Sequence, residues 1–328
     1  MNNMLFPKII EYQPYSICNA NCTYCPVGHL NRVSKQKKHE ITKDVFYNLV
    51  EQVKGKEIVR ISPHLNCEPL LSKDLEEQFQ IWKINHPNAE IVMSTNAVFL
   101  SNERFLSLSE SGLDILELHF MGVNKEYHEN AMQTNFEKVQ TNIENVLAFQ
   151  KKEKINKTKI ILFSHRLQGA SLNDWNDFAV KWEDKGATMQ FGPLWNRAGW
   201  YGDEFEKKRK GILKSNKPYP CNKPWEQLAV EADGEVVLCS LDYKKVVKIG
   251  NITKNSIEEI WNNEVMKKYQ IGQNDPEKLS KLDLCNNCIR GGRYLLNEKK
   301  LTKLITAKKN NLVSQYLYKK YLNIMDFF

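Results

Sequence analysis

Eight cysteines are the residues of this 328-residue chain whose type and spacing best support chemistry. The N-terminus lacks the charged start and long apolar stretch of a signal peptide, and no apolar run approaches the roughly 18 residues that cross a bilayer. We therefore expect a cytoplasmic protein, in which cysteines favour metal or redox chemistry over disulfides. They form an early group of three, one isolated position and a late group of four: Cys18, Cys22, Cys25, Cys67, Cys221, Cys239, Cys285 and Cys288.

The early group has the pattern Cys-x3-Cys-x2-Cys, from Cys18 through Cys22 to Cys25. Three thiolates on one loop can hold three irons of a cubane iron–sulfur cluster and leave the fourth iron open. An open metal position is where substrate chemistry takes place. His29 follows four residues later, so a zinc site with three cysteines and one histidine is the alternative that spacing leaves open.

The late group combines a hairpin with a distant pair. Twelve residues separate Cys221 from Gly234, four more separate Gly234 from Cys239, and the pair Cys285-Asn-Asn-Cys288 comes much later. Four thiolates suit either a fully ligated iron–sulfur cluster or a four-cysteine zinc site. The residues alone do not choose between the two.

The elements that must position these cysteines alternate between strands and helices over the first two-thirds of the chain. Apolar runs predict strands at 13–17, 57–62, 90–94, 115–120, 159–163 and 188–191, with helices at 43–54, 73–85, 101–111, 135–150 and 173–185. Thr42 and Ser101 are expected as helix N-caps, and Gly112 and Gly186 as C-caps. Six β/α units predict an α/β fold with a parallel sheet, an open (β/α)6 part of a TIM-like barrel. Because sites lie at the carboxyl ends of such strands, the early cysteines are well placed after strand one.

The pattern changes near residue 200. We expect a barrel core over 1–200, a charged linker helix over 201–216, a small cysteine module over 217–295 and a basic helical tail over 296–328. The Asp233-Gly234 pair between apolar runs predicts a hairpin in the module. The tail has Leu, Ile and Tyr at helical spacing, which favours an amphipathic helix pair docked on the barrel or on a partner.

The early cysteine loop after strand one of six β/α units resembles the radical S-adenosylmethionine (SAM) superfamily. The resemblance implies that Cys18, Cys22 and Cys25 bind a [4Fe–4S] cluster whose open iron is chelated by SAM. One electron then cleaves SAM to methionine and a 5′-deoxyadenosyl radical, which abstracts a hydrogen atom from the substrate. Tyr24 matches the aromatic residue that contacts the adenine side.

Further segments resemble the SAM-binding motifs of this superfamily. The segment from Asn66 to Leu71 matches a Gly-Gly-Glu-Pro-like motif, in which Glu68 would accept from the SAM ammonium, although Asn66 and Cys67 replace the glycines. The alternative is that these polar side chains are ordinary loop, cap or packing residues. The other residues expected to contact SAM by this resemblance are Asn96, Glu117, His119, Ser164 and Arg166.

The late group resembles the auxiliary-cluster module of the SPASM/Twitch subgroup. Tyr294 stands where the longer SPASM form has its next cysteine, so the resemblance implies the shorter Twitch form with one auxiliary [4Fe–4S] cluster. The chain would then hold two [4Fe–4S] clusters and SAM. The auxiliary cluster would accept an electron from a substrate radical, and a reductant such as flavodoxin or ferredoxin would supply the first electron.

Two more residues are candidates for catalysis. Cys67 belongs to neither group and lies beside Glu68, so it could return a hydrogen atom to a substrate radical, as a free cysteine does in radical epimerases. The alternative is a small packing residue in a glycine-like position. Arg197, at the end of strand six, could bind a substrate anion or act as a base, or form a salt bridge with the module.

The expected activity is hydrogen abstraction from a small polar substrate (a sugar, an aminocyclitol or a nucleotide-linked sugar), followed by oxidation or epimerisation. A peptide-modifying maturase is the first alternative, and a non-enzymatic iron–sulfur or zinc-binding protein is the second. The net charge of +8 comes from 47 Lys and Arg against 39 Asp and Glu. The lysines are scattered outside the tail, so we expect neither nucleic acid nor membrane as a partner.

Overall fold

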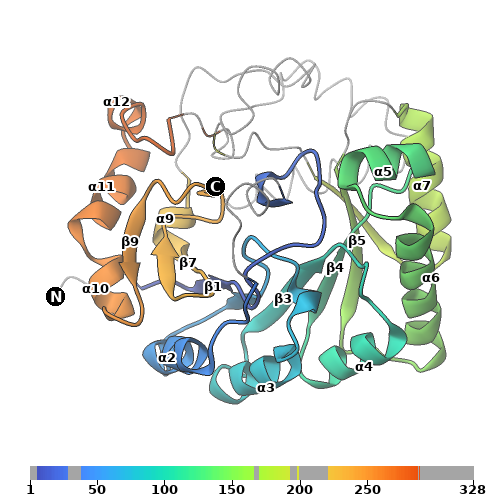
Figure 1. The fold of residues 1–328 in the computed structure, drawn as a ribbon, viewed down its shortest axis with the longest axis horizontal. Helices are drawn as coiled ribbons and strands as arrows, with labels where there is room; N and C mark the ends of the chain where they lie inside the picture. The colour runs from blue at the N-terminus through green and yellow to red at the C-terminus, as the bar shows by residue number, and fades with distance from the viewer. Residues whose placement is uncertain are drawn as a thin grey trace.

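The computed structural model describes residues 6–28, 38–165, 170–192, 198, 221–286 and 288, and within them one sheet has nine strands (Figure 1). The strand order is β6-β5-β4-β3-β2-β1-β7-β8-β9. The first six strands are parallel: β1 (Ile9–Tyr12), β2 (Arg60–Ser62), β3 (Glu90–Thr95), β4 (Ile115–His119), β5 (Lys159–His165) and β6 (Thr188–Gly192). This confirms the predicted open barrel.

The helices of the barrel lie along the outer side of the curved sheet (Figure 1). Thr42 caps the first of them by accepting from the Val45 N–H, and Ser101 caps another by accepting from Arg104 N–H, as predicted. Helix α5, which lies between β4 and α6, was not predicted from the sequence. The helices are α2 (Lys43–Val53), α3 (Leu75–Asn85), α4 (Asn102–Glu110), α5 (Lys125–Met132), α6 (Phe136–Lys152) and α7 (Leu172–Asp184).

The first strand is earlier than predicted. β1 ends at Tyr12, whereas the sequence placed it at 13–17. The last ladder bond runs from the Gln13 N–H to the Val230 carbonyl, and Pro14 has no N–H with which to continue. Strand β2 is likewise shorter than the predicted 57–62. The other four strands agree with their predicted ranges to within two residues.

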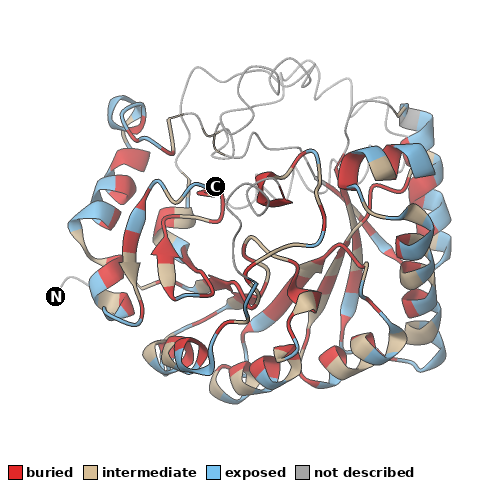
Figure 2. Ribbon diagram, in the orientation of Figure 1, coloured by how far each residue is buried: buried red, intermediate tan, exposed pale blue. Residues whose placement is uncertain are grey.

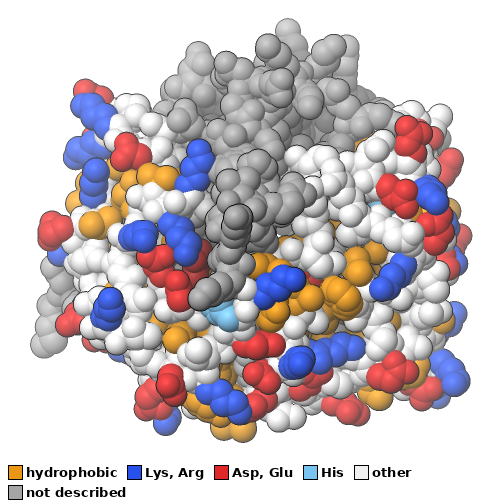
Figure 3. Space-filling view, viewed as in Figure 1, with side chains coloured by type: hydrophobic (Ala, Val, Ile, Leu, Met, Phe, Trp, Pro, Cys, Tyr) orange, Lys and Arg blue, Asp and Glu red, His pale blue; other side chains and the backbone are white. Residues whose placement is uncertain are grey.

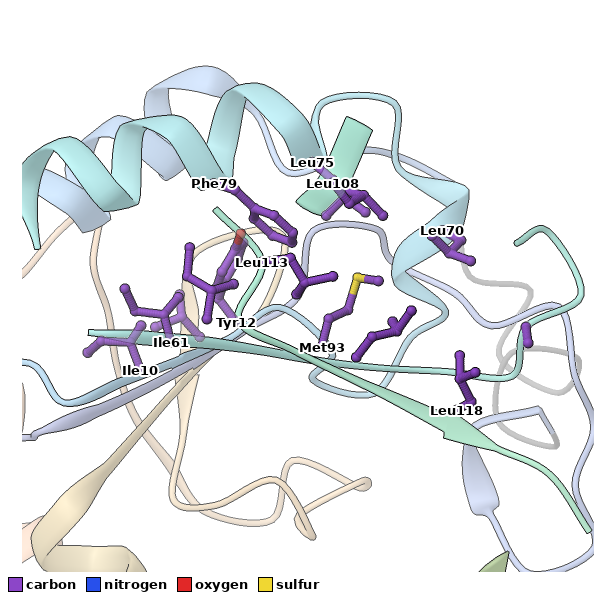
Figure 4. Close-up of a cluster of buried hydrophobic side chains, with 14 of the residues drawn as sticks. Ile10, Tyr12, Ile61, Leu70, Leu75, Phe79, Met93, Leu108, Leu113 and Leu118 are labelled. Atoms are coloured by element: carbon purple, nitrogen blue, oxygen red, sulfur yellow. The ribbon is translucent and has the colours of Figure 1, made fainter. Parts of the chain in front are cut away.

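The main core lies between the sheet and its helices. Side chains alternate along the strands, so Tyr12, Ile61 and Met93 point toward the helices and are fully buried. Figure 4 shows them packed against Phe79 of α3. Burying each such side chain contributes about 1.5–3 kcal/mol. The Tyr12 hydroxyl keeps a partner in this core by donating to Gln78 Oε1 at 2.8 Å.

The module that carries the late cysteines extends the barrel sheet. Strand β7 (Gln227–Val230) is parallel to β1, and the antiparallel strands β8 (Glu235–Val237) and β9 (Lys248–Asn251) follow it. Gly234 turns the predicted β7–β8 hairpin with a φ of 80°. Buried residues occupy the strands on both sides of β1 (Figure 2). The helices of the module are α9 (Lys223–Glu226), α10 (Ile257–Trp261), α11 (Glu264–Gln273) and α12 (Pro276–Leu279).

The linker helix expected at 201–216 and the tail expected at 296–328 lie outside the described residues. On the face shown in Figure 3, Lys and Arg side chains alternate with Asp and Glu. No helix among the described residues is long and apolar enough to cross a membrane.

Candidate iron–sulfur and SAM site

The early cysteines lie on the loop that follows β1, at the carboxyl edge of the parallel strands. The Cys25 N–H donates to the Cys22 carbonyl at 3.0 Å and so forms a tight turn. Burial raises the pKa of the Cys18 thiol, and the nearby Glu68, Cys22 and Cys25 charges raise it further. A cation or cluster is therefore needed to hold the Cys18 thiol as a thiolate.

The described cysteine sulfurs are more widely spaced than the four ligands of a single zinc ion. Among the described residues, only Glu231, Asp233 and Glu235 have three ligand atoms that all lie within 4.8 Å of one another. Four sulfurs around one zinc would lie about 3.8 Å apart, given a Zn–S bond of about 2.3 Å. In the described part of the chain, neither cysteine group has three sulfurs as close together as this. His29 lies outside the described residues.

Glu68 joins the loops that follow β2 and β3. Its side chain is 2% exposed and forms the N-cap of the short helix η1 (Pro69–Leu71). Oε1 accepts from the Leu70 N–H at 3.0 Å and from the Thr95 hydroxyl at 2.5 Å, and Oε2 accepts from the Asn96 N–H at 2.9 Å. Burial still raises the pKa of this carboxyl to about 7. Three of roughly four acceptor positions are thus used by the protein, and one is left for the predicted contact with SAM.

Asn96 connects this carboxyl to the cysteine loop. Its Nδ2 donates to Asn19 Oδ1 at 2.9 Å and lies 3.9 Å from Cys18 Sγ. The Glu68 N–H donates to the Ile17 carbonyl at 3.1 Å, next to Cys18. The three predicted site residues Cys18, Glu68 and Asn96 therefore lie together.

Asn66 and Cys67 replace the two glycines of the motif. Asn66 has a φ of 49°, in the left-handed region that glycine favours and that Asn tolerates better than most residues. Cys67 is half-buried, and burial raises its thiol pKa, with Glu68 adding to the shift. The Cys67 thiol is therefore protonated, the form that a hydrogen-atom donor requires.

An aromatic cluster adjoins the cysteine loop. Tyr24 is buried with its ring edge-on to His165, at 5.2 Å between centroids. His119 stacks on Phe163 at 4.8 Å and also contacts His165. His165 was not singled out from the sequence, because a lone histidine has no ligand spacing. Its place on the inward face of β5, in line with Phe163, is the signal that could have found it.

Glu117 faces the inside of the barrel beside Ser94, whose hydroxyl donates to Oε2 at 2.7 Å. Burial acts to raise the Glu117 pKa, but the Ser94 bond and the charges of His119, His64 and Arg60 outweigh it, so the pKa is lowered. His64 accepts from the Ser94 N–H at Nδ1, 3.2 Å away. Burial lowers the pKa of His64, which the sequence did not single out.

Ser164 is not brought to this inward face. It is fully buried on the helix side of β5, and its hydroxyl contacts Met121 Sδ at 3.4 Å. Because side chains alternate along a strand, Ser164 points away from Phe163 and His165. Its predicted contact with SAM does not fit this orientation. Arg166 and Arg197 lie outside the described residues.

The late cysteines gather at one end of the β7–β9 module. Cys239 follows β8, and its Sγ accepts from the Leu241 N–H at 3.3 Å. Cys285 Sγ accepts from Gln273 Nε2 at 3.3 Å, and the oxygen of the same amide accepts from the Cys221 N–H. The Cys288 N–H donates to the Cys285 carbonyl at 3.1 Å. N–H donors aimed at sulfur are typical of thiolates that ligate iron–sulfur clusters, so these residues fit such a group.

Comparison with known families agrees with both cysteine groups. Residues 12–165 match the radical SAM superfamily, and residues 221–289 match SPASM, an iron–sulfur cluster-binding domain. The chain belongs to the radical SAM superfamily. It is a radical SAM enzyme that uses SAM and iron–sulfur chemistry, which sets aside the non-enzymatic alternative.

This radical SAM enzyme has a relative of similar length. It is 25% identical over 284 residues to the S-adenosyl-L-methionine-dependent 2-deoxy-scyllo-inosamine dehydrogenase of Niallia circulans. The match covers 86% of this chain and 92% of the relative. The similarity agrees with an enzyme of the oxidoreductase type.

Solved structures share the fold. BtrN in complex with AdoMet and 2-DOIA superposes with a TM-score of 0.59 at 24% identity, covering 87% of this chain and 93% of BtrN. The anSMEcpe structure with bound AdoMet gives 0.63 at 18% identity and covers 98% and 96% of the two chains. Streptococcus suis SuiB bound to the precursor peptide SuiA gives 0.64 at 13% identity, covering 91% and 73%.

Proposed function

We propose that this radical SAM enzyme dehydrogenates an alcohol carbon of a small polyhydroxylated substrate of the aminocyclitol class. The observation that carries the proposal is the complete set of four late cysteines in a module whose sheet is continuous with that of the barrel. Support also comes from the similarity to a 2-deoxy-scyllo-inosamine dehydrogenase over most of both chains. Epimerisation is the other expected outcome.

The donor sets suit two [4Fe–4S] clusters, one held by Cys18, Cys22 and Cys25 and the other by the four late cysteines in a Twitch-type module. When bound, these groups and SAM would supply a 5′-deoxyadenosyl radical for hydrogen abstraction and an acceptor for a second electron. The oxidation of an alcohol to a carbonyl is then balanced in atoms and electrons. One hydrogen atom leaves to the deoxyadenosyl carbon, one electron leaves to the acceptor, and the hydroxyl proton leaves to a base or to water.

In this proposal, side chains of the barrel bind and orient SAM and the substrate. Tyr24, Glu68 and Asn96 contact SAM near the cysteine loop, and Glu117 and His119 contact its ribose. Arg166 is a further expected contact to SAM. The substrate lies between the barrel and the late module, next to Cys67, and Arg197 would bind a substrate anion or act as a base. The boundaries expected from the sequence, with a core to residue 200 and a module over 217–295, belong to the same proposal.

Polar inward-facing side chains support a hydroxyl-rich substrate. Glu11, Ser62 and Ser94 alternate with outward apolar residues on β1 to β3, and the register places Glu11 beside Ser62. Such donors and acceptors bind hydroxyl groups, which an apolar pocket does not select. We also propose a cytoplasmic location and a flavodoxin or ferredoxin as reductant.

Anaerobic reconstitution with iron and sulfide tests the proposal. We expect about eight irons per chain and formation of 5′-deoxyadenosine upon reduction with SAM. A panel of deuterated aminocyclitols, sugars and a model peptide then identifies the substrate class by deuterium transfer into 5′-deoxyadenosine. Deuterium from the peptide alone would overturn the small-molecule proposal.

The Cys285→Ala variant separates the two clusters. We expect it to hold about four irons, to keep SAM cleavage and to lose the oxidised product, because four thiolates are needed for a closed cluster. Cys67→Ala is the matched control outside both groups, and it should keep all eight irons. Oxidation at the normal rate by Cys285→Ala would contradict an electron-accepting role for the late group.

A further inference from the structure

Lys223 is a half-buried cation between the barrel and the late cysteines. It begins α9, two residues after Cys221, and its side chain is 13% exposed. Its Nζ donates to Ser240 Oγ at 3.0 Å and to Gln227 Oε1. Ser240 directly follows Cys239, so two hydrogen bonds hold the ammonium beside the chain segments that carry two of the four late cysteines.

Glu11 is an acidic neighbour of Lys223, but the two groups lie beyond hydrogen-bond distance. Glu11 Oε2 lies 3.8 Å from Lys223 Nζ, and this oxygen is buried without a hydrogen-bond partner. The Glu11 residue is 8% exposed and lies on the inward face of β1. A pair kept for stability would close to a normal hydrogen bond, because an unmade bond to a buried charge is costly. The position of Lys223 is instead fixed by module residues.

The charge of Lys223 reaches the late cysteines. The Lys223 ammonium donates to the hydroxyl of Ser240, which directly follows Cys239, and Lys223 itself is two residues from Cys221. At a site with so little exposure, charges interact more strongly than in water. Net charge, burial and hydrogen bonds at the sulfurs set the reduction potential of an iron–sulfur cluster.

We propose that Lys223 raises the reduction potential of the auxiliary cluster and that Glu11 lowers it, so that this pair tunes the cluster as an electron acceptor. The inference rests on the proposed function, since it requires a cluster on the four late cysteines. A nearby positive charge stabilises the reduced form of the cluster, which has one more negative charge, and a carboxylate destabilises it. Lys223 and Glu11 are positioning residues, because neither ligates iron.

A redox titration followed by electron paramagnetic resonance tests the inference. The parent is the full-length chain with Cys18→Ala, Cys22→Ala and Cys25→Ala, so that the signal comes from the auxiliary cluster alone. We expect Lys223→Met to weaken one-electron reduction at least tenfold, a shift of about 59 mV to more negative potential. Lys223→Arg keeps the charge and should stay near the parent potential.

Glu11→Gln is the variant of opposite sign, and it should shift the potential to more positive values. General damage to the site would not produce shifts of opposite sign from the two substitutions. An unchanged midpoint in Lys223→Met, with about four irons retained, would overturn the inference. If Lys223→Met loses iron, the Glu11→Gln variant alone decides the question. The inference is then overturned if Glu11→Gln does not shift the potential to more positive values. A parent chain without about four irons would instead contradict the proposed function.

Discussion

Glu68 combines two properties that are normally opposed. It accepts three hydrogen bonds, which stabilise a carboxylate, yet its burial raises the pKa to about 7. Burial therefore outweighs the hydrogen bonds. Near neutral pH the carboxyl that joins the β2 and β3 loops changes charge, close to the thiols of the early group.

This raised pKa predicts a pH dependence of stability. The folded state keeps a proton that the unfolded state, with an ordinary pKa of 4.5, releases. The free energy of unfolding should therefore fall as the pH rises from 4.5 through about 7, by roughly 1 kcal/mol between pH 6 and pH 8. Anaerobic urea unfolding of the wild type and Glu68→Gln at both pH values measures the difference. An equal pH dependence in the two proteins would contradict it.

Glu68→Gln should also be less stable at pH 6, where the wild-type carboxyl is mostly protonated and carries no charge penalty. The substitution replaces one oxygen by an amide nitrogen, which cannot accept from Asn96 or Leu70. We expect a loss of about 1–3 kcal/mol in the free energy of unfolding. Glu126→Gln is a matched control, since Glu126 is exposed on α5, outside the site. An equal loss in the two variants would count against a special role for the buried carboxyl.

Site residues that belong to a short sequence motif were predicted from their spacing, whereas isolated site residues were missed. Cys18, Glu68 and Asn96 follow from short patterns, and they lie together in the structure. Glu11 and Lys223 have no local pattern, because strand pairing over more than 200 residues brings them together. With the first strand placed four residues too late, Glu11 could not be recognised as facing inward.

At the scale of elements, α2 supports the late module as well as the barrel. Asn48 and Gln52 both donate to the Ile252 carbonyl, at 2.8 and 2.9 Å. Gln52 Oε1 accepts from the Ile257 N–H at the start of α10, at 2.6 Å. One glutamine thus satisfies backbone groups at two points of the module.

Gln52→Ala should destabilise the protein by about 1–3 kcal/mol, because it leaves the Ile257 N–H without its acceptor. Gln80→Ala is the matched control, since Gln80 is exposed on α3 and its contact with Ser111 is long, at 3.5 Å. Chemical denaturation of both variants measures the effect. Equal stability of the two would show that the contact from α2 contributes little.

The ends of helices were predicted correctly where the sequence has a capping residue. Side-chain caps at Thr42 and Ser101 fixed helix starts, and Gly112 and Gly186 follow helix ends with positive φ. The helix α5 was missed because its eight residues are mostly polar and its buried face is short. No local signal could show that β7 pairs with β1, since that pairing depends on the whole sheet.

At the scale of the molecule, the barrel and the late module share one sheet. β1 is hydrogen-bonded to β2 on one side and to β7 on the other. We therefore expect β1, β2 and β7 to unfold as one unit, with similar protection free energies in hydrogen exchange followed by mass spectrometry. Exchange from α12, which lies at the periphery, is the reference for local opening. Protection of β7 as low as that of α12 would contradict a single unit.

The pairing of β1 with β7 also has a consequence for biosynthesis. Ile9 pairs with Gln227, so β1 leaves the ribosome 218 residues before its second partner. At about 5–20 residues per second, this edge stays open for roughly ten to forty seconds, available to other nascent chains. Slower folding is also expected from pairings this distant. Translation speed and chaperone supply should therefore govern the yield of this enzyme.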